Sequence, residues 1–316
     1  MMGKIAYLFP GQGSQSVGMG QDLANKYENV KEIFLEADHA LQDSLYELIM
    51  TGPQESLTLT TNAQPALLTT SIAILQKVKE YHIEADFVAG HSLGEYTALV
   101  AAGSLSFRDA VQIVRKRGEF MEEAVPNGQG TMAAILGMDA EKLTEITNEV
   151  TETTGSVQLA NLNCPGQIVI SGTREGVEKA CQLAKENGAR RAIPLEVSGP
   201  FHSRLMESAS QKLKEVLDKH NFSSAKTPVI SNVTAEPVTD ADQIKDLLIK
   251  QLYSPVRWEE SIRTMMDLGV DTFIEIGPGK VLTGLVRKID RKAKIYNIFD
   301  EASLIKTVEQ LRGDNE

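Results

Sequence analysis

The segment around residue 92 constrains the fold of this chain more than any other part of the sequence. Residues 90–94 read Gly-His-Ser-Leu-Gly, a G-x-S-x-G pentapeptide. The apolar run Ala85–Ala89 precedes it, and a run rich in helix formers extends from Leu93 to Ala102 and ends at Gly103. This order predicts a buried strand, a sharp turn and a helix, with a serine exposed at a strained corner. The alternative is a tight structural turn that carries an incidental serine.

Strand and helix patterns alternate over most of the chain. Strand patterns cover residues 5–9, 228–231 and 272–276, and helix patterns cover 31–50, 64–80, 107–124, 203–219, 240–252 and 259–268. Alternation of this kind predicts an α/β protein with a mostly parallel sheet and helices on both faces.

The stretch between residues 129 and 197 has a different rhythm. After the break PNGQG at 126–130, the patterns follow the order β-α-β-β-α-β, which is the ferredoxin-like arrangement. We therefore predict a small ferredoxin-like subdomain of residues 129–197. It is inserted into a larger domain formed by residues 1–128 and 198–316.

Composition and charge exclude several classes of function. The net charge of −11 is spread along the chain, which argues against nucleic acid as a ligand. The two cysteines, Cys164 and Cys181, show neither metal-ligand spacing nor a disulfide framework. No apolar run approaches the ~20 residues that span a bilayer, and the N-terminal run is too short for a signal peptide. We expect a cytoplasmic protein without metal or membrane contact.

A serine nucleophile at position 92 needs a base, because a free hydroxyl barely ionises at neutral pH. His202 is the best candidate, since it lies in the run SGPFHS at a strand-to-helix junction, where α/β sheets place catalytic groups. The alternative is a histidine that only caps a helix. His91 precedes the serine and points elsewhere if Ser92 tops the turn. No Asp or Glu occurs in a motif that would identify it as the acidic partner of the histidine. A backbone carbonyl can fix the imidazole tautomer instead.

Arg117 is the most informative charged residue. It falls on the same helical stripe as Ile113, Val114 and Met121, which predicts a guanidinium on the core side of its helix. A buried cation must be paired with an anion. The anion is either an internal Asp or Glu or the carboxylate of a ligand, for which a guanidinium offers a bidentate clamp.

The loop Gly11-Gln12-Gly13, after the first predicted strand, has two interpretations. A dinucleotide-binding loop fails, because the G-x-G-x-x-G pattern needs a third glycine where the chain has Ser16. The other interpretation is a loop that brings a backbone N–H to the nucleophile. One N–H from this loop and that of Leu93 would then form an oxyanion hole.

Taken together, these motifs resemble the malonyl-CoA:acyl-carrier-protein transacylases of bacterial fatty-acid synthesis. The matching segments are Phe9–Gln15, Gly90–Glu95, Arg117, Ala160–Gln167, Gly199–His202, Gln251–Trp258 and Glu275–Leu282, in one register from residue 5 to about 290. The resemblance implies a hydrolase-like α/β core with a ferredoxin-like insertion. It also implies a monomer that needs no cofactor and transfers malonyl groups from a coenzyme A thioester to acyl carrier protein.

The resemblance assigns roles residue by residue. Ser92 is the expected nucleophile and His202 its base, while the N–H groups of Gln12 and Leu93 form the oxyanion hole. Arg117 would bind the malonyl carboxylate, and Gln251 would orient His202 through its main-chain carbonyl. We further expect Met121, Asn163 and Phe201 to contact the acyl or pantetheine groups. Leu93 and Phe201 stand where relatives that take methylmalonyl carry Gln and Ser, which favours malonyl.

Two other classes of function share part of this pattern. A serine esterase would use Ser92 and His202 but would release free acid and leave Arg117 without a purpose. A catalytically idle carrier-binding module would not react at Ser92. The exposed basic runs have two interpretations as well, a docking surface for an acidic carrier or simply solvated faces; they are Lys185, Arg190, Arg191, Arg287, Lys288, Arg291 and Lys292.

Overall fold

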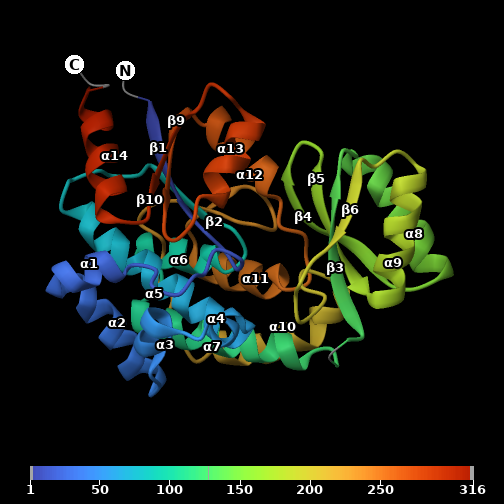
Figure 1. The fold of residues 1–316 in the computed structure, drawn as a ribbon, viewed down its shortest axis with the longest axis horizontal. Helices are drawn as coiled ribbons and strands as arrows, with labels where there is room; N and C mark the ends of the chain where they lie inside the picture. The colour runs from blue at the N-terminus through green and yellow to red at the C-terminus, as the bar shows by residue number, and fades with distance from the viewer. Residues whose placement is uncertain (1–2, 127, 314–316) are drawn as a thin grey trace.

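The computed structural model describes residues 3–126 and 128–313 and contains two units, each built around one sheet (Figure 1). The larger unit holds a six-stranded sheet in the order β10-β9-β1-β2-β7-β8. Its strands are β1 (Lys4–Phe9), β2 (Phe87–Gly90), β7 (Val229–Ile230), β8 (Pro237–Val238), β9 (Val270–Ile276) and β10 (Lys294–Ile298). All neighbours pair in parallel except β7 and β8, which pair antiparallel. The predicted mostly parallel sheet is therefore confirmed.

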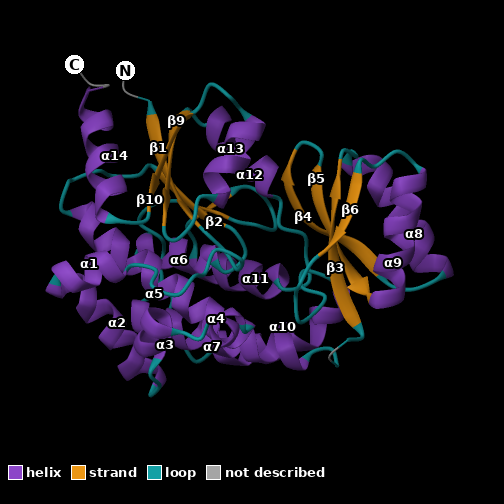
Figure 2. Ribbon diagram, in the orientation of Figure 1, coloured by secondary structure: helices purple, strands orange, loops and turns teal. Residues whose placement is uncertain are grey.

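Helices cover both faces of this sheet (Figure 2). They are α1 (Gln21–Lys26), α2 (Glu28–Leu41), α3 (Leu45–Thr51), α4 (Gln54–Thr58), α5 (Thr60–Lys79), α6 (Gly94–Ala101), α7 (Phe107–Glu123), α10 (Glu207–Leu217), α11 (Ala241–Gln251), α12 (Trp258–Asp267), α13 (Val281–Ile289) and α14 (Glu301–Gly313). Successive side chains of β1 enter opposite cores, as the period of a strand requires. Tyr7 and Phe9 pack with α5 and α6, while Ala6 and Leu8 pack with α12 and α13.

The smaller unit has the ferredoxin-like topology that the sequence predicts. Its elements are β3 (Gly130–Leu136), α8 (Ala140–Thr153), β4 (Val157–Cys164), β5 (Gln167–Thr173), α9 (Arg174–Glu186) and β6 (Arg191–Pro194). The sheet is antiparallel in the order β4-β5-β3-β6, and α8 and α9 pack on one face of it. The division of the chain at residues 128 and 198 stays a prediction.

Strand β4 joins the two units. The N–H of Leu162 donates to the carbonyl of Val256 at 2.9 Å, and the N–H of Val256 donates to the carbonyl of Ala160 at 2.8 Å. Since Val256 precedes α12 of the larger unit, these bonds fix the small sheet against the large one.

Several sequence-based boundaries are wrong. The predicted helix over residues 31–50 is two helices, α2 and α3, because Gln42 adopts a left-handed conformation (φ 53°) and ends the first. The helix predicted from Ser203 begins instead with a 3-10 turn, Arg204–Met206, before α10. The strand predicted over residues 191–197 ends at Pro194 as β6. Within the described residues, no helix is long and apolar enough to span a membrane.

Candidate active site

The turn between β2 and α6 has the strained geometry that the pentapeptide predicts. Ser92 lies in the left-handed region at φ 52°, which costs energy for any residue but glycine. A Cβ on Gly90 would lie 1.9 Å from the backbone of Gly94, and a Cβ on Gly94 would lie 2.2 Å from the carbonyl oxygen of Phe9. Glycine at both positions is therefore a steric requirement of the turn.

Asn232, just after β7, holds this turn from the neighbouring strand. Its Oδ1 accepts the N–H of Ser92 at 2.7 Å, and its Nδ2 donates to the carbonyl of Gly90 at 2.7 Å. The side chain is fully buried. Sequence reasoning missed Asn232, because its role depends on a contact across 140 positions of the chain.

His202 lies beside Ser92. Its Nε2 is 2.7 Å from Ser92 Oγ, and its Nδ1 is 2.9 Å from the main-chain carbonyl oxygen of Gln251. A carbonyl can only accept, so Nδ1 carries the proton and Nε2 is left to accept from the hydroxyl. Burial and the nearby Arg117 cation lower the pKa of His202 to about 3, so the ring is neutral near pH 7.

Two backbone N–H groups near Ser92 lack acceptors. Gln12 lies in the loop after β1 and lines the cavity at the serine, while Leu93 is the N-cap residue that directly precedes α6. Neither N–H donates a hydrogen bond within the part of the chain that the structure describes. The Gln12 side chain is held by Thr60, whose Oγ1 accepts from Gln12 Nε2 at 3.1 Å.

Arg117 is buried on α7, as its helical stripe predicts, with 1% of its surface exposed. Its partners are neutral: the side-chain oxygens of Gln64 and Gln251, each at 2.8 Å, and the hydroxyl of Ser92 at 3.1 Å. Its Nε makes no hydrogen bond with any residue that the structure describes. No carboxylate of the described residues lies within ion-pair distance of it. An acidic partner in direct contact is therefore absent among the described residues, and Glu95 attracts the Arg117 cation only from a longer distance.

One buried carboxylate is linked to Ser92 through the side chain of Gln251. Glu95, on the first turn of α6, accepts Gln251 Nε2 at 2.7 Å and the N–H of Asn232 at 3.2 Å. Burial raises the pKa of Glu95 to about 7. Sequence reasoning missed Glu95 and Gln64, although Glu95 directly follows the pentapeptide.

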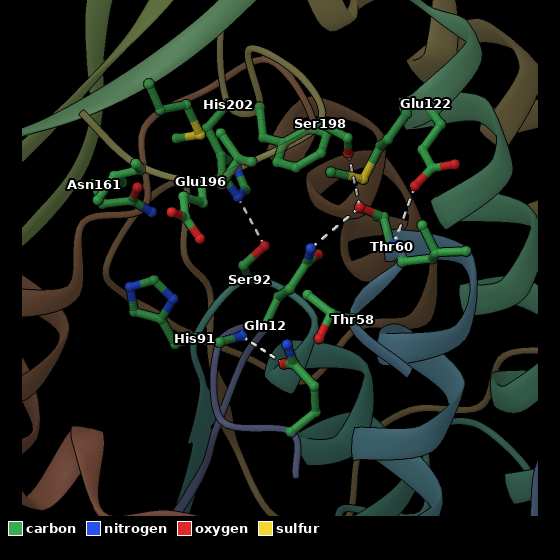
Figure 3. Close-up of a pocket in the computed structure, with 18 of the residues that line it drawn as sticks. Gln12, Thr58, Thr60, His91, Ser92, Glu122, Asn161, Glu196, Ser198 and His202 are labelled. Atoms are coloured by element: carbon green, nitrogen blue, oxygen red, sulfur yellow. Dashed lines mark hydrogen bonds between the residues drawn. The ribbon is translucent and has the colours of Figure 1, made fainter. Parts of the chain in front are cut away.

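A cavity of about 340 Å³ opens onto Ser92 and His202, and Figure 3 shows the side chains around it. Both units line it. Met121 and Phe201 lie in its wall, and the small unit contributes Met132, Asn161 and Leu195. Asn163 does not line this cavity; its Oδ1 is 2.9 Å from His91 Nε2, so it contacts the histidine instead. A direct contact between Asn163 and the acyl or pantetheine group stays a prediction.

An α/β sheet with a serine on a strand-to-helix turn, a neutral histidine beside it and unpaired N–H groups nearby is typical of enzymes that transfer acyl groups. Comparison with known proteins agrees with this class. The profile of the acyl transferase domain matches residues 6–308. The malonyl CoA-acyl carrier protein transacylase of Bacillus subtilis is 62% identical over 100% of this chain and 99% of its own length.

Several solved structures of related enzymes have nearly the same fold as this chain. An acyl carrier protein S-malonyltransferase from Vibrio cholerae has a TM-score of 0.94 at 45% identity, covering 96% of this chain and 99% of its own. A malonyl-transacylase solved in complex with its type II PKS acyl-carrier protein has a TM-score of 0.94 at 43% identity, covering 97% and 99%. The chain belongs to the acyl transferase domain family, and within it to the malonyl CoA-acyl carrier protein transacylases.

Proposed function

We propose that this chain transfers the malonyl group of malonyl-CoA to the phosphopantetheine thiol of an acyl carrier protein, by way of a malonyl ester on Ser92. The product is the malonyl thioester that fatty-acid elongation consumes. The observation that carries the proposal is the position of Arg117: a buried cation that forms no ion pair with a described residue and lies 3.1 Å from the serine hydroxyl. A cation there recognises an acyl group that ends in a carboxylate.

In the first half-reaction, the malonyl carboxylate binds Arg117 and the thioester carbonyl faces Ser92. His202 Nε2 takes the hydroxyl proton as Oγ attacks the carbonyl carbon. The oxyanion accepts from the N–H groups of Gln12 and Leu93. The carbon–sulfur bond then breaks, and the proton on His202 passes to the departing coenzyme A thiolate.

In the second half-reaction, the pantetheine thiol of the carrier gives its proton to His202 and attacks the ester of Ser92. The ester bond breaks, and the proton on His202 returns to the serine oxygen. The two substrates use the site in turn, so kinetics should be ping-pong. Every proton moves through one imidazole, which the carbonyl of Gln251 keeps in the required tautomer.

Other parts of the proposal follow from this chemistry. Serine, histidine and two N–H groups suffice for both steps, so the proposal includes no metal and no cofactor. All contributing residues come from one chain, which favours a monomer. Both substrates belong to the cytoplasm of a bacterium, and we place the chain there.

The test is intact-mass spectrometry of the chain after mixing with malonyl-CoA, followed by addition of holo acyl carrier protein. We expect one malonyl group on the wild-type chain, none on Ser92→Ala, and its transfer to the carrier. An adduct that is lost only to water would indicate a hydrolase. No adduct, together with no fluorophosphonate labelling of Ser92, would indicate an idle binding module.

A further inference from the structure

Glu95 is a buried acid with no basic partner. Only 3% of its surface is exposed, and no Lys or Arg of the described chain lies within ion-pair distance of its carboxylate. Its carboxylate accepts from Gln251 Nε2 and from the N–H of Asn232. These two residues hold the histidine and the serine turn. Burial of an acid without a basic partner is costly, and the reaction steps described above do not use this carboxylate.

We propose that Glu95 is a positioning residue that sets the acyl selectivity of the site by fixing which way the Gln251 side chain faces. This inference rests on the proposed function and deepens it. Glu95 touches neither substrate nor the reacting atoms. It acts on Arg117 through one intervening amide.

The two ends of the Gln251 side-chain amide differ, because its oxygen accepts hydrogen bonds and its NH₂ donates them. An ionised carboxylate only accepts, so Gln251 must turn its NH₂ toward Glu95, and the same NH₂ also donates to the Ser92 carbonyl at 3.0 Å. The amide oxygen is then directed at Arg117 Nη2, 2.8 Å away. A reversed amide would set its N–H groups against those of the guanidinium. The charge of Glu95 therefore maintains the orientation in which Gln251 receives Arg117.

The main chain of Gln251 has a separate task. Its carbonyl accepts His202 Nδ1, and that contact does not depend on which way the side-chain amide faces. Loss of the Glu95 charge should therefore weaken recognition of the malonyl carboxylate more than it weakens the Ser92–His202 pair. A purely structural role would weaken both equally.

The other titratable groups of the site keep the same charge between pH 6 and 8, so a change in activity over this range can be assigned to Glu95. The charged and titratable groups that interact with it are Arg117 on α7 and Tyr96 on its own helix, and the other titratable groups of the site are His91 and His202. Burial raises the pKa of Glu95 to about 7, raises the pKa of Tyr96, and lowers the pKa of both histidines, that of His202 to about 3. Among these groups, Glu95 is the one expected to change charge between pH 6 and 8.

The first experiment compares two rates on the same protein. One is kcat/KM for malonylation of Ser92 by malonyl-CoA, and the other is the rate of Ser92 labelling by a neutral fluorophosphonate, which needs the serine and histidine but no carboxylate clamp. In Glu95→Gln, we expect the malonylation rate to fall about tenfold further than the labelling rate, the ratio that one charged hydrogen bond represents. Equal changes in the two rates, or no change in either, would overturn the proposal.

Glu275→Gln is the matched control. Glu275 is also a fully buried carboxylate, but it caps α13 by accepting the N–H groups of Leu282 and Thr283, away from the cavity. We expect its ratio of malonylation to labelling to equal that of the wild type. A ratio that falls as far in Glu275→Gln as in Glu95→Gln would show a general effect of buried acids and overturn the proposal.

The second experiment needs no variant, so it stands even if Glu95→Gln fails to fold. In the wild type, malonylation should fall relative to labelling as the pH drops through about 7, because protonation removes the charge that orients Gln251. A flat ratio from pH 6 to 8 would contradict the proposal. A wild-type chain that labels at Ser92 but never takes a malonyl group would instead contradict the proposed function, so the two failures are distinct.

Discussion

Arg117 shows how a single residue can prepare a site for a charged ligand. Burial of an unpaired cation costs several kcal/mol, and the fold offsets part of this cost with two amide oxygens rather than a carboxylate. An acid in ion-pair contact would have neutralised the charge. Neutral acceptors orient the guanidinium and leave its positive charge for the carboxylate that the proposed function assigns to it.

The Arg117→Ala variant tests this view. We expect malonyl transfer to fall by the equivalent of about 2–5 kcal/mol, the loss for a desolvated charge pair, while acetyl transfer rises. The measurement is kcat/KM for malonyl-CoA and acetyl-CoA in parallel. Arg115→Ala, two positions earlier on the same helix and paired with Asp43 outside the site, is the control. An unchanged preference for malonyl in Arg117→Ala would show that the arginine is not the clamp.

Glu95 also predicts a dependence of stability on pH. Its pKa rises from an ordinary 4.5 to about 7 on folding, so between these values the folded chain binds more protons than the unfolded chain. Stability from this group therefore falls as the pH rises. Urea unfolding should show the wild type losing about 2.5 kcal/mol relative to Glu95→Gln between pH 5 and 8. Glu309→Gln, exposed on α14, is the control, and a constant difference between wild type and Glu95→Gln would refute the shift.

The site residues that could be predicted from the sequence carry a local signal, and those that were missed depend on contacts with distant parts of the chain. Ser92 stands in a local motif, and Arg117 is an exception within its own helical stripe. Asn232, Gln64 and Glu95 carry no such local signal, because their partners lie 53 to 156 positions away along the chain. Long-range hydrogen bonds of this kind leave no trace in composition or periodicity.

At the scale of elements, the sharp turn from β2 into α6 is the feature on which the site depends. Periodicity located this turn and most helices, because an amphipathic stripe extends over many residues. Periodicity failed to predict the end of α2, because this end depends on one residue. Gln42 adopts a left-handed conformation there, and the hydrophobic pattern does not indicate it. It also left β10 and α13 unassigned.

Replacement of Gly94 tests the turn. A Cβ there would lie 2.2 Å from the Phe9 carbonyl oxygen, so backbone must shift, and we expect Gly94→Ala to lose about 2–4 kcal/mol of stability and most fluorophosphonate labelling of Ser92. The control is Gly284→Ala on α13, where an added Cβ meets no atom within 4 Å. That variant should gain up to about 1 kcal/mol from helix propensity. Equal thermal stability of the two variants would contradict the steric argument.

At the scale of the whole molecule, the cavity lies where the two units meet, and exposed basic residues occur on both. Arg190 directly precedes β6 and Arg191 is its first residue. Arg287 and Lys288 lie in the last turn of α13. The net charge of the chain is negative, so any attraction for an acidic carrier must come from local groups such as these.

Charge reversal tests the docking of the carrier. We expect the double variants Arg190→Glu with Arg191→Glu, and Arg287→Glu with Lys288→Glu, to raise KM for holo carrier protein and to leave KM for malonyl-CoA unchanged. The effect should shrink with added salt. Lys306→Glu, exposed on α14, is the control. Equal effects on both substrates would indicate that these runs are only solvated faces.

The inserted unit has a mechanical consequence for the site. The chain enters the small unit after α7, the helix that carries Arg117, and returns to the large unit between β6 and α10 (Figure 1). His202 lies in this returning segment. Arg117, the proposed anion clamp, and His202, the proposed general base, therefore lie on the two segments that connect the small unit to the large one. A carrier that tilted the small unit would move both groups together, and a change in hydrogen exchange confined to the two connectors on carrier binding would indicate that they respond to it.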